Sequence, residues 1–224
     1  MKHIITLDGP AGVGKSTLAR RVAEHLHLAY LDTGAMFRII AKTLGASGLH
    51  LPEEELAAAL EKLRFSLSGS GNATVLACNG IPAGLEIRTE DISMLASEYA
   101  ALPVVRAYLK TAQQTLGEAY PLVVEGRDMG TAVFPLAPYK FFLDASPETR
   151  AQRRVKQLAE NGIVEELSCV VEQIKKRDDK DRNRAIAPLK PAEDAILVDT
   201  SALDIEGVFR AILAAIDTGA GTAR

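Results

Sequence analysis

The sequence predicts an α/β fold in which helices flank a parallel sheet, and three observations indicate it. First, an apolar run at residues 4–7 leads into a glycine-rich loop and then into an amphipathic run at 18–26. Second, the runs at 122–124 and 139–143 are apolar without alternation, which is typical of parallel strands covered on both faces. Third, runs with helical spacing separate these strands along the chain.

The glycine-rich loop has the spacing G-x-x-x-x-G-K-[ST], with Gly9, Gly14, Lys15 and Ser16 at the fixed positions. Such a P-loop turns successive backbone N–H groups onto phosphate oxygens, its lysine reaches the β- and γ-phosphates, and its hydroxyl binds Mg²⁺. A strand enters the loop and a helix leaves it, so the helix N-terminus also faces the phosphates. The alternative is a chance match in a glycine-rich turn. The context favours a site for a nucleoside triphosphate.

Composition narrows the function classes. The 224 residues suit one α/β domain with insertions, and 47% hydrophobic with 25% charged residues is ordinary for a globular protein. A net charge of −3 gives no reason to expect a nucleic-acid or membrane surface, and no apolar run approaches the length of a membrane span. Cys78 and Cys169 lack metal-type spacing, and no signal-peptide pattern is visible. We therefore expect a cytoplasmic enzyme with reduced thiols.

Between the first and third strands the chain is expected to fold into helices and a small β insert. A strand at 29–31 ends in a polar turn and opens a helix whose first turn carries Arg38. Because the helix dipole opposes a cation there, Arg38 is expected to have an anionic partner. A helix is predicted over 52–63. The runs at 65–81, broken by glycine-rich turns that include Asn79-Gly80, predict an antiparallel hairpin unit.

The later part of the chain carries many arginines. Helices are predicted from Pro147 and over 167–177, followed by residues 175–184 with six basic and three acidic side chains. Most of this run reads as a solvated helix face with ion pairs. Because basic side chains outnumber local acids and face a P-loop, a few of the arginines are expected to belong to a lid that closes over phosphates. A last strand at 195–199 and a last helix at 205–216 complete the fold.

These features favour transfer between two phosphates. Polar residues follow several predicted strands, including Asp8, Asp32, Asp128 and Asp144, and ligands of parallel sheets gather at that edge. An acceptor phosphate is already anionic and needs no general base, but two polyanions repel. At about 4 Å that repulsion costs about 4 kcal/mol per charge pair at an effective dielectric of 20. Arginines and Mg²⁺ are suited to offset it.

Motifs along nearly the whole chain resemble those of bacterial cytidylate kinases, nucleoside monophosphate kinases that phosphorylate CMP and dCMP. They are DGPAGVGKST, DTGAMFR, IRTED with Ser97 and Arg106, EGRDMGTAVFP and KRDDKDRNRAIAPLKP. The resemblance implies a P-loop kinase with a five-stranded parallel sheet flanked by helices, a small antiparallel β insert and a helical lid. It implies a single domain over 1–224, with a core at 1–45, 118–146 and 190–224, a monophosphate-binding insert at about 46–117 and a lid at about 147–189. Phe37 departs from the tyrosine that the family commonly has.

The resemblance also implies the roles of individual residues. The ATP phosphates would be bound by Gly9, Pro10, Ala11, Gly12, Val13, Gly14, Lys15, Ser16 and Thr17, with Ser16 as the Mg²⁺ ligand. The acceptor phosphate and the transferring group would be held by Thr33, Arg38, Arg127 and Arg184, the last three acting with Lys15 in catalysis. The cytosine would be read by Ser97, Arg106 and Asp128, and the pentose by Arg177 and Asp181. Arg153 and Arg154 are further lid candidates.

The expected partners are ATP and CMP or dCMP, with Mg²⁺ as cofactor, no nucleic acid or membrane, and a monomeric chain. The alternatives are a P-loop kinase for UMP, AMP or a sugar-like alcohol, and a nucleotide-dependent switch. An alcohol acceptor would call for a carboxylate base, and a guanine-reading N-K-x-D is absent from the sequence. Asp128 also has an alternative, in which it only pairs with Arg106 or Arg127 to organise its turn.

Overall fold

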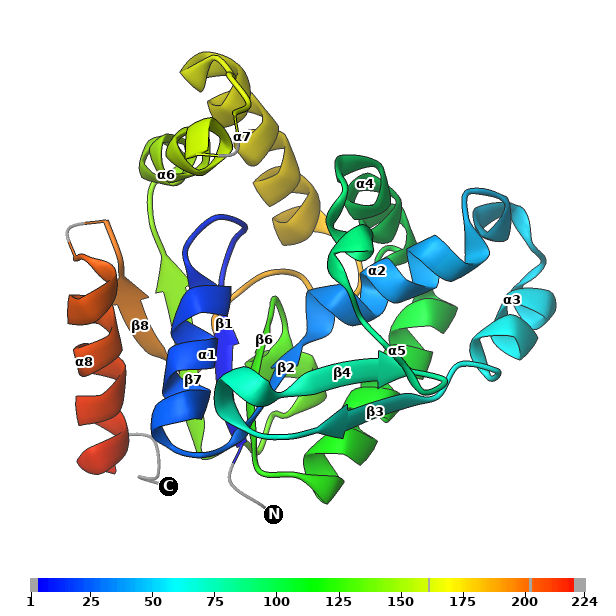
Figure 1. The fold of residues 1–224 in the computed structure, drawn as a ribbon, viewed down its shortest axis with the longest axis horizontal. Coiled ribbons are helices and arrows are strands. Elements are labelled where there is room, and N and C mark those ends of the chain that lie inside the picture. Colours follow the sequence, from blue (N-terminus) through cyan, green and yellow to red (C-terminus); the bar gives the residue numbers. More distant parts are fainter. Residues whose placement is uncertain (1–3, 161, 202, 220–224) are drawn as a thin grey trace.

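The computed structural model describes residues 4–160, 162–201 and 203–219, so residues 1–3, 161, 202 and 220–224 of the predicted domain lie outside it. Five strands form a parallel sheet in the order β2-β6-β1-β7-β8 (Figure 1). Their bounds are β1 (Ile4–Asp8), β2 (Ala29–Asp32), β6 (Leu122–Gly126), β7 (Tyr139–Asp144) and β8 (Ile196–Asp199). The predicted five-stranded sheet is therefore confirmed.

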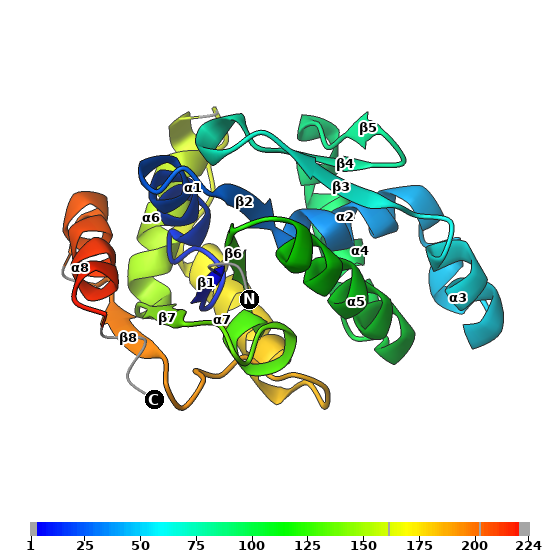
Figure 2. The same cartoon turned by 90° about the horizontal axis from the view of Figure 1, so that it is seen from below.

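Helices cover both faces of this sheet, which explains why its strands are apolar without alternation. On one face, α1 (Lys15–His25) and α8 (Ile205–Asp217) pack on Leu7, Val123 and Phe141. On the other, α2 (Thr33–Leu44) and α5 (Pro103–Ala119) pack on Leu31 and Val124. Figure 2 shows α1 and α8 on one side of the sheet and α5 on the other. Among the described residues, no helix combines the length and apolar character that crossing a bilayer requires.

The predicted β insert is present as a three-stranded antiparallel sheet of β3 (Phe65–Ser68), β4 (Val75–Cys78) and β5 (Ile81–Pro82). Asn79 and Gly80 form its second turn, both with positive φ (51° and 78°), as an Asn-Gly hairpin requires. The first turn meets the main sheet, where the Gly71 amide donates to the Leu28 carbonyl at 2.7 Å and the Tyr30 amide to Thr74 Oγ1 at 3.1 Å. The insert thus covers the open edge of β2.

Helices α3 (Glu53–Leu60) and α4 (Glu90–Tyr99) complete this part of the chain, with short turns η1 (Ser47–His50), η2 (Gly71–Ala73) and η3 (Leu85–Arg88) between the elements. The helix predicted over 52–63 therefore ends at Leu60, although Leu63 is still buried. Thr89 caps α4, and Pro103 stands in the first turn of α5, where its missing N–H costs nothing.

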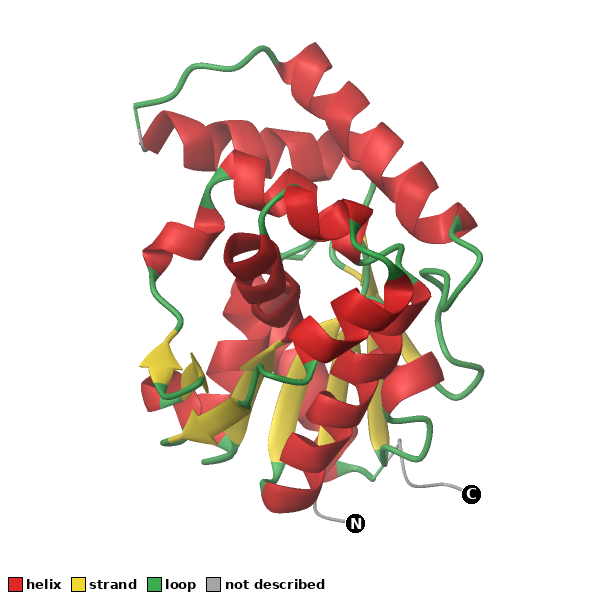
Figure 3. Cartoon of the chain, turned by 90° about the vertical axis from the view of Figure 1, so that its right-hand side faces the viewer, coloured by secondary structure: helices red, strands yellow, loops and turns green. Residues whose placement is uncertain are grey.

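Helices α6 (Pro147–Glu160) and α7 (Leu167–Asn183) stand above the carboxyl ends of the strands (Figures 1 and 3). They share a small apolar cluster of Ala151, Val170 and Ile174 that is separate from the clusters on the sheet. Helix α7 continues to Asn183, beyond the predicted end at residue 177. The charged run that suggested an earlier end remains helical, with an i,i+4 pair between Glu172 and Lys176 and with Asp178 buried against α6.

Candidate active site

The P-loop lies between β1 and α1 at the carboxyl edge of the sheet. Gly9 has φ 146°, and a Cβ at this position would lie 2.1 Å from the Leu143 carbonyl oxygen, so only glycine fits. Gly14 has φ 95° and precedes α1, with no side chain capping the helix N-terminus. No acidic residue lies in the first turn of α1. The free N–H groups and the positive dipole end therefore suit an anion.

Lys15 lies beneath this loop, only 5% exposed, and its ammonium donates to the Pro10 carbonyl at 2.6 Å. Burial lowers the pKa of Lys15 well below its usual value, and the charge of Arg127 lowers it further, whereas Glu125 and Asp8 oppose the shift. Bound phosphate oxygens would supply negative charge next to this ammonium and raise its pKa again. The placement agrees with a phosphate-binding lysine.

Glu125 is a site residue that the sequence analysis missed. It lies in β6 next to the P-loop strand, is 5% exposed, and accepts hydrogen bonds from Ser16 Oγ at 2.9 Å and from the Tyr30 hydroxyl. Burial and the nearby charge of Asp32 raise the pKa of its carboxyl. An acidic residue near the end of an otherwise apolar buried strand was the signal that could have revealed it.

The oxygen atoms around Ser16 are suitable ligands for Mg²⁺. Mg²⁺ prefers oxygen ligands and in nucleotide enzymes uses one or two carboxylates together with waters and substrate phosphates. The Ser16 hydroxyl and the Glu125 carboxylate, 2.9 Å apart beside the P-loop, provide such a pair. Within the described ranges no group of three or more His, Cys, Asp or Glu side chains is arranged to hold a metal, so an all-protein cage is not offered.

Asp32 organises the acceptor side of the site. It accepts from the Ala35 amide as the N-cap of α2, from Arg38 at 2.9 Å and from Arg88 at 3.0 Å. The expected anionic partner of Arg38 is therefore Asp32. Nε of Arg38 is buried without a hydrogen-bond partner among the described residues, which leaves one donor for a ligand. Thr33 Oγ1 donates to the Glu125 carbonyl at 2.7 Å.

A second carboxylate, Asp128, lies where β6 leads into the short helix η4 (Met129–Val133). Arg106 donates to one of its oxygens and Arg184 to the other at 3.0 Å. Ser97 lies half-buried on α4. The structure thus brings together Arg106, Asp128 and Arg184, and among the described residues no hydrogen bond joins the Ser97 side chain to them.

A third pair joins the sheet to α7. Nε of Arg127 donates to Asp181 Oδ2 at 3.0 Å, and both side chains are largely buried. Arg127 therefore does not pair with Asp128, the other partner considered from the sequence. Arg177 lies one turn before Asp181 on the same helix and is exposed. The two predicted pentose contacts thus share one stretch of α7.

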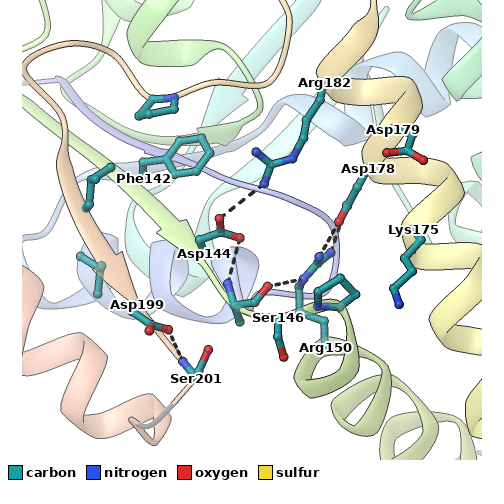
Figure 4. A pocket seen from close by; sticks show the side chains of 15 residues that line it. Phe142, Asp144, Ser146, Arg150, Lys175, Asp178, Asp179, Arg182, Asp199 and Ser201 are labelled. Atoms are coloured by element: carbon teal, nitrogen blue, oxygen red, sulfur yellow. Dashed lines mark hydrogen bonds and ion pairs between the residues drawn. The ribbon is translucent and has the colours of Figure 1, made fainter.

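Arg150 is the second residue that the sequence analysis missed. Its guanidinium is 1% exposed, donates to the Ala11 carbonyl of the P-loop at 3.0 Å, and forms a two-pronged pair with Asp178 of α7 (Figure 4). Arg182 reaches Asp144 at 3.4 Å. Arg150 and Arg182 therefore each have an acidic partner, the first on α7 and the second at the end of β7.

Beside these pairs lies a cavity of about 840 Å³ between β7, β8, α6 and α7 (Figure 4). No P-loop residue lines it, and its charged side chains have both signs. Arg153 donates to the side chain and backbone oxygens of Thr200 after β8, whereas Arg154 contacts Gln157 on its own helix. Of the two lid candidates, only Arg153 bridges to another element.

Three comparisons with known proteins bear on this site. The family model described as Cytidylate kinase matches residues 5–218. A cytidylate kinase of Oleidesulfovibrio alaskensis is 58% identical over 94% of this chain and 96% of its own, and one of Nitratidesulfovibrio vulgaris is 60% identical over 94% and 90%. The crystal structure of an uncharacterized protein from Eubacterium ventriosum has a similar fold, with a TM-score of 0.52 at 15% identity over 97% of this chain and 99% of that one.

Proposed function

Since the chain belongs to the cytidylate kinase family, we propose that it transfers the γ-phosphoryl group of ATP to CMP or dCMP, giving ADP and CDP or dCDP. The observation that carries this proposal is the set of arginines around the P-loop. Arg38, Arg127 and Arg184 come from three separate parts of the chain. Asp32 and Asp128 at the carboxyl edge of the sheet hold Arg38 and Arg184, and Asp181 of α7 holds Arg127. Such an arrangement suits two phosphates that must be brought together.

The chemistry needs little beyond positioning and charge. An anionic oxygen of the acceptor phosphate attacks the γ-phosphorus, and the bond from that phosphorus to the bridging oxygen of ADP breaks. No proton has to be removed from the nucleophile. Arg38 and Arg127 bind the acceptor phosphate with Thr33, and Lys15 and Arg184 follow the transferring group. Guanidinium forks match the planar array of phosphoryl oxygens better than point charges do.

Residues 9–17 hold the ATP phosphates, and Ser16 would hold Mg²⁺ with Glu125 beside it. The ion, when bound, would supply charge neutralisation of the triphosphate. The hydrogen bond from Ser16 to Glu125 supports this assignment, because it keeps the two oxygens 2.9 Å apart beside the loop. The pentose contacts are Arg177 and Asp181.

The base is read by Ser97, Arg106 and Asp128. Cytosine offers an exocyclic amine where uracil offers a carbonyl oxygen, and an ionised carboxylate only accepts hydrogen bonds. Asp128 therefore bonds the cytosine amine and repels uracil. Its two arginine partners support this role, since they fix the orientation of the carboxylate.

The proposed organisation has three parts: a core (1–45, 118–146 and 190–224), a monophosphate-binding insert (about 46–117) and a lid (about 147–189). The separate apolar cluster between α6 and α7 supports a lid that moves as a unit. The chain acts as a cytoplasmic monomer that binds neither nucleic acid nor membrane.

Initial rates with ATP, Mg²⁺ and a panel of CMP, dCMP, UMP, AMP and a sugar alcohol test the proposal. We expect turnover with CMP or dCMP to exceed that with every other acceptor. Preferred turnover of UMP, AMP or the alcohol would reassign the acceptor. Nucleotide binding without transfer to any of them would favour a switch and contradict the proposal.

A further inference from the structure

One buried carboxylate, Asp8, has no part in the function proposed so far. It is the last residue of β1, directly before Gly9 of the P-loop, and it is 4% exposed. Its Oδ1 accepts from the Met129 amide at 2.9 Å and its Oδ2 from the Gly130 amide at 2.7 Å. Both hydrogen bonds reach across the sheet edge to the first turn of η4.

The position of η4 leaves little freedom around these bonds. A Cβ on Gly130 would lie 3.2 Å from Thr6 Oγ1, 3.2 Å from Lys140 Cδ and 3.4 Å from Asp8 Oδ2. A side chain there would be tightly packed against all three atoms, so one of these neighbours, the Asp8 carboxylate among them, would have to shift by a few tenths of an ångström. Met129 directly follows Asp128, so the first turn of η4 fixes where the Asp128 backbone lies.

We propose that Asp8 is a positioning residue that links the ATP-binding loop to Asp128, and this inference rests on the proposed function. Asp8 sets the position of Met129 and Gly130, and through them the angle at which Asp128 meets the base. Because Asp8 adjoins Gly9, the same carboxylate fixes the position of the ATP site relative to the site that binds the base.

The electrostatics agree with this role. Burial raises the pKa of Asp8 to about 6, and the negative charge of Asp128 raises it, while the two amide hydrogen bonds and the charge of Lys15 lower it. Asp8 is therefore costly to ionise, and the sequence nevertheless has a carboxylate here, close to the carboxylate of Asp128. If the side chain at position 8 were protonated or were an amide, it would not accept from both the Met129 and the Gly130 amides.

The test is Asp8→Asn, whose amide keeps the shape but can accept only through one atom. We expect kcat/KM for CMP to fall at least about tenfold. The CMP-to-UMP ratio, which is kcat/KM for CMP divided by kcat/KM for UMP, should also narrow by about tenfold. Each change corresponds to one lost hydrogen bond in the transition state. KM for ATP should stay within about threefold, since the P-loop glycines remain. In an Asp128→Asn background, Asp8→Asn should narrow the ratio no further.

Asp204→Asn is the matched control, because Asp204 also accepts from a backbone amide, that of Gly207 at 2.7 Å, but at the start of α8. It should leave the ratio unchanged. If Asp8→Asn does not fold, Gly130→Ala, which keeps the carboxylate and crowds its donor, should narrow the ratio in the same direction.

An unchanged ratio in both Asp8→Asn and Gly130→Ala, or equal losses for CMP and UMP, would overturn the inference. Additive effects of Asp8→Asn and Asp128→Asn would overturn it as well. The parent enzyme in the same assay separates this failure from that of the proposed function. A parent that does not phosphorylate CMP refutes the proposed function, whereas an active parent with a parent-like Asp8→Asn variant refutes only the role of Asp8.

Discussion

Single carboxylates hold the cations of this site in place. Asp32 holds Arg38 and Arg88, Asp128 holds Arg106 and Arg184, and Asp181 holds Arg127, all at or near the carboxyl edge of the sheet. A guanidinium that already has one partner loses less side-chain freedom when a phosphate arrives. The carboxylates also keep like-charged arginines close together before any substrate binds. Preorganisation of this kind is worth more to catalysis than the same charges on mobile side chains.

Lys15 offers a prediction about phosphoryl transfer. Lys15→Met should reduce kcat by well over tenfold, since a lost contact to the transferring group costs more than about 1.4 kcal/mol. Lys140→Met is a matched control, because Lys140 is equally buried and its ammonium also donates to a proline carbonyl at 2.6 Å. Steady-state rates of folded protein, checked by circular dichroism, measure both. Activity of Lys15→Met within about tenfold of the parent would refute the role of Lys15.

Asp128 offers a prediction about the base. Asp128→Asn should reduce kcat/KM for CMP strongly and narrow the CMP-to-UMP ratio, because an amide can donate to the uracil oxygen as well as accept from cytosine. A buried polar group can favour one substrate over another by a factor of about 10⁴ in kcat/KM. This factor sets the upper limit for the change in the CMP-to-UMP ratio.

The control for Asp128 is Glu206→Gln. Glu206 also accepts from two arginines, Arg21 and Arg210, but on α8 and away from the site. The Glu206→Gln variant should have kcat/KM values for CMP and for UMP within about threefold of those of the parent. If Asp128→Asn instead lowers CMP and UMP turnover by the same factor, Asp128 only organises its turn and the base is read by other residues.

Among the elements, α6 and α7 have the loosest connection to the body of the molecule. Their apolar cluster is small, and they meet the core mainly through polar contacts such as Arg150 with Ala11 and Arg127 with Asp181. Contacts of this kind open at low free energy compared with a packed core. We predict that residues 147–184 exchange amide hydrogens quickly in the free protein and become protected when ATP and CMP are both bound.

Hydrogen exchange measured by mass spectrometry, with and without both nucleotides, checks the lid prediction. The body of helix α1, which packs on the sheet, serves as the internal reference. Unchanged protection across 147–184 would contradict closure. Within the segment, Arg184→Lys should lower kcat more than it raises KM for CMP, since a point charge cannot replace a planar fork on the transferring group.

The elements were largely predictable from the sequence, whereas the site was predictable only in part. Unbroken apolar strands and the Asn79-Gly80 turn carry local signals, so the parallel sheet and the β insert were found. The far end of α7 was missed because a dense charged run looks like a helix end until its partners on other elements are known. Glu125 and Arg150 were missed because their partners are all at least 28 residues away along the chain; these partners are Ser16, Tyr30, Ala11 and Asp178.

For the whole molecule, Asp8 predicts a dependence of stability on pH. Its pKa is about 6 in the folded protein and about 3.8 in the unfolded chain, so folding is favoured while the carboxyl is protonated. The associated stability is fully present below about pH 4 and is lost as the pH rises through about 6, a change of about 3 kcal/mol. Urea unfolding of the parent and of Asp8→Asn at pH 5 and pH 7 measures the last part of this loss, about 1.3 kcal/mol.

The difference between the two proteins isolates Asp8 from the other titrating groups. The free energy of unfolding of Asp8→Asn relative to the parent should rise between pH 5 and pH 7, because only the parent pays for ionising a buried carboxyl. A relative stability that is constant, or that falls over this interval, would show that the pKa of Asp8 is not raised.

The central claim is that this molecule moves a phosphoryl group from ATP onto the phosphate of a cytidine nucleotide. Phosphorus-31 NMR of one reaction containing ATP, Mg²⁺, CMP and the protein tests it most directly, because each phosphorus in substrates and products gives its own resonance. We expect the signals of CDP and ADP to grow in equal amounts while inorganic phosphate stays near the level of a protein-free sample. Growth of inorganic phosphate and ADP without CDP would contradict it.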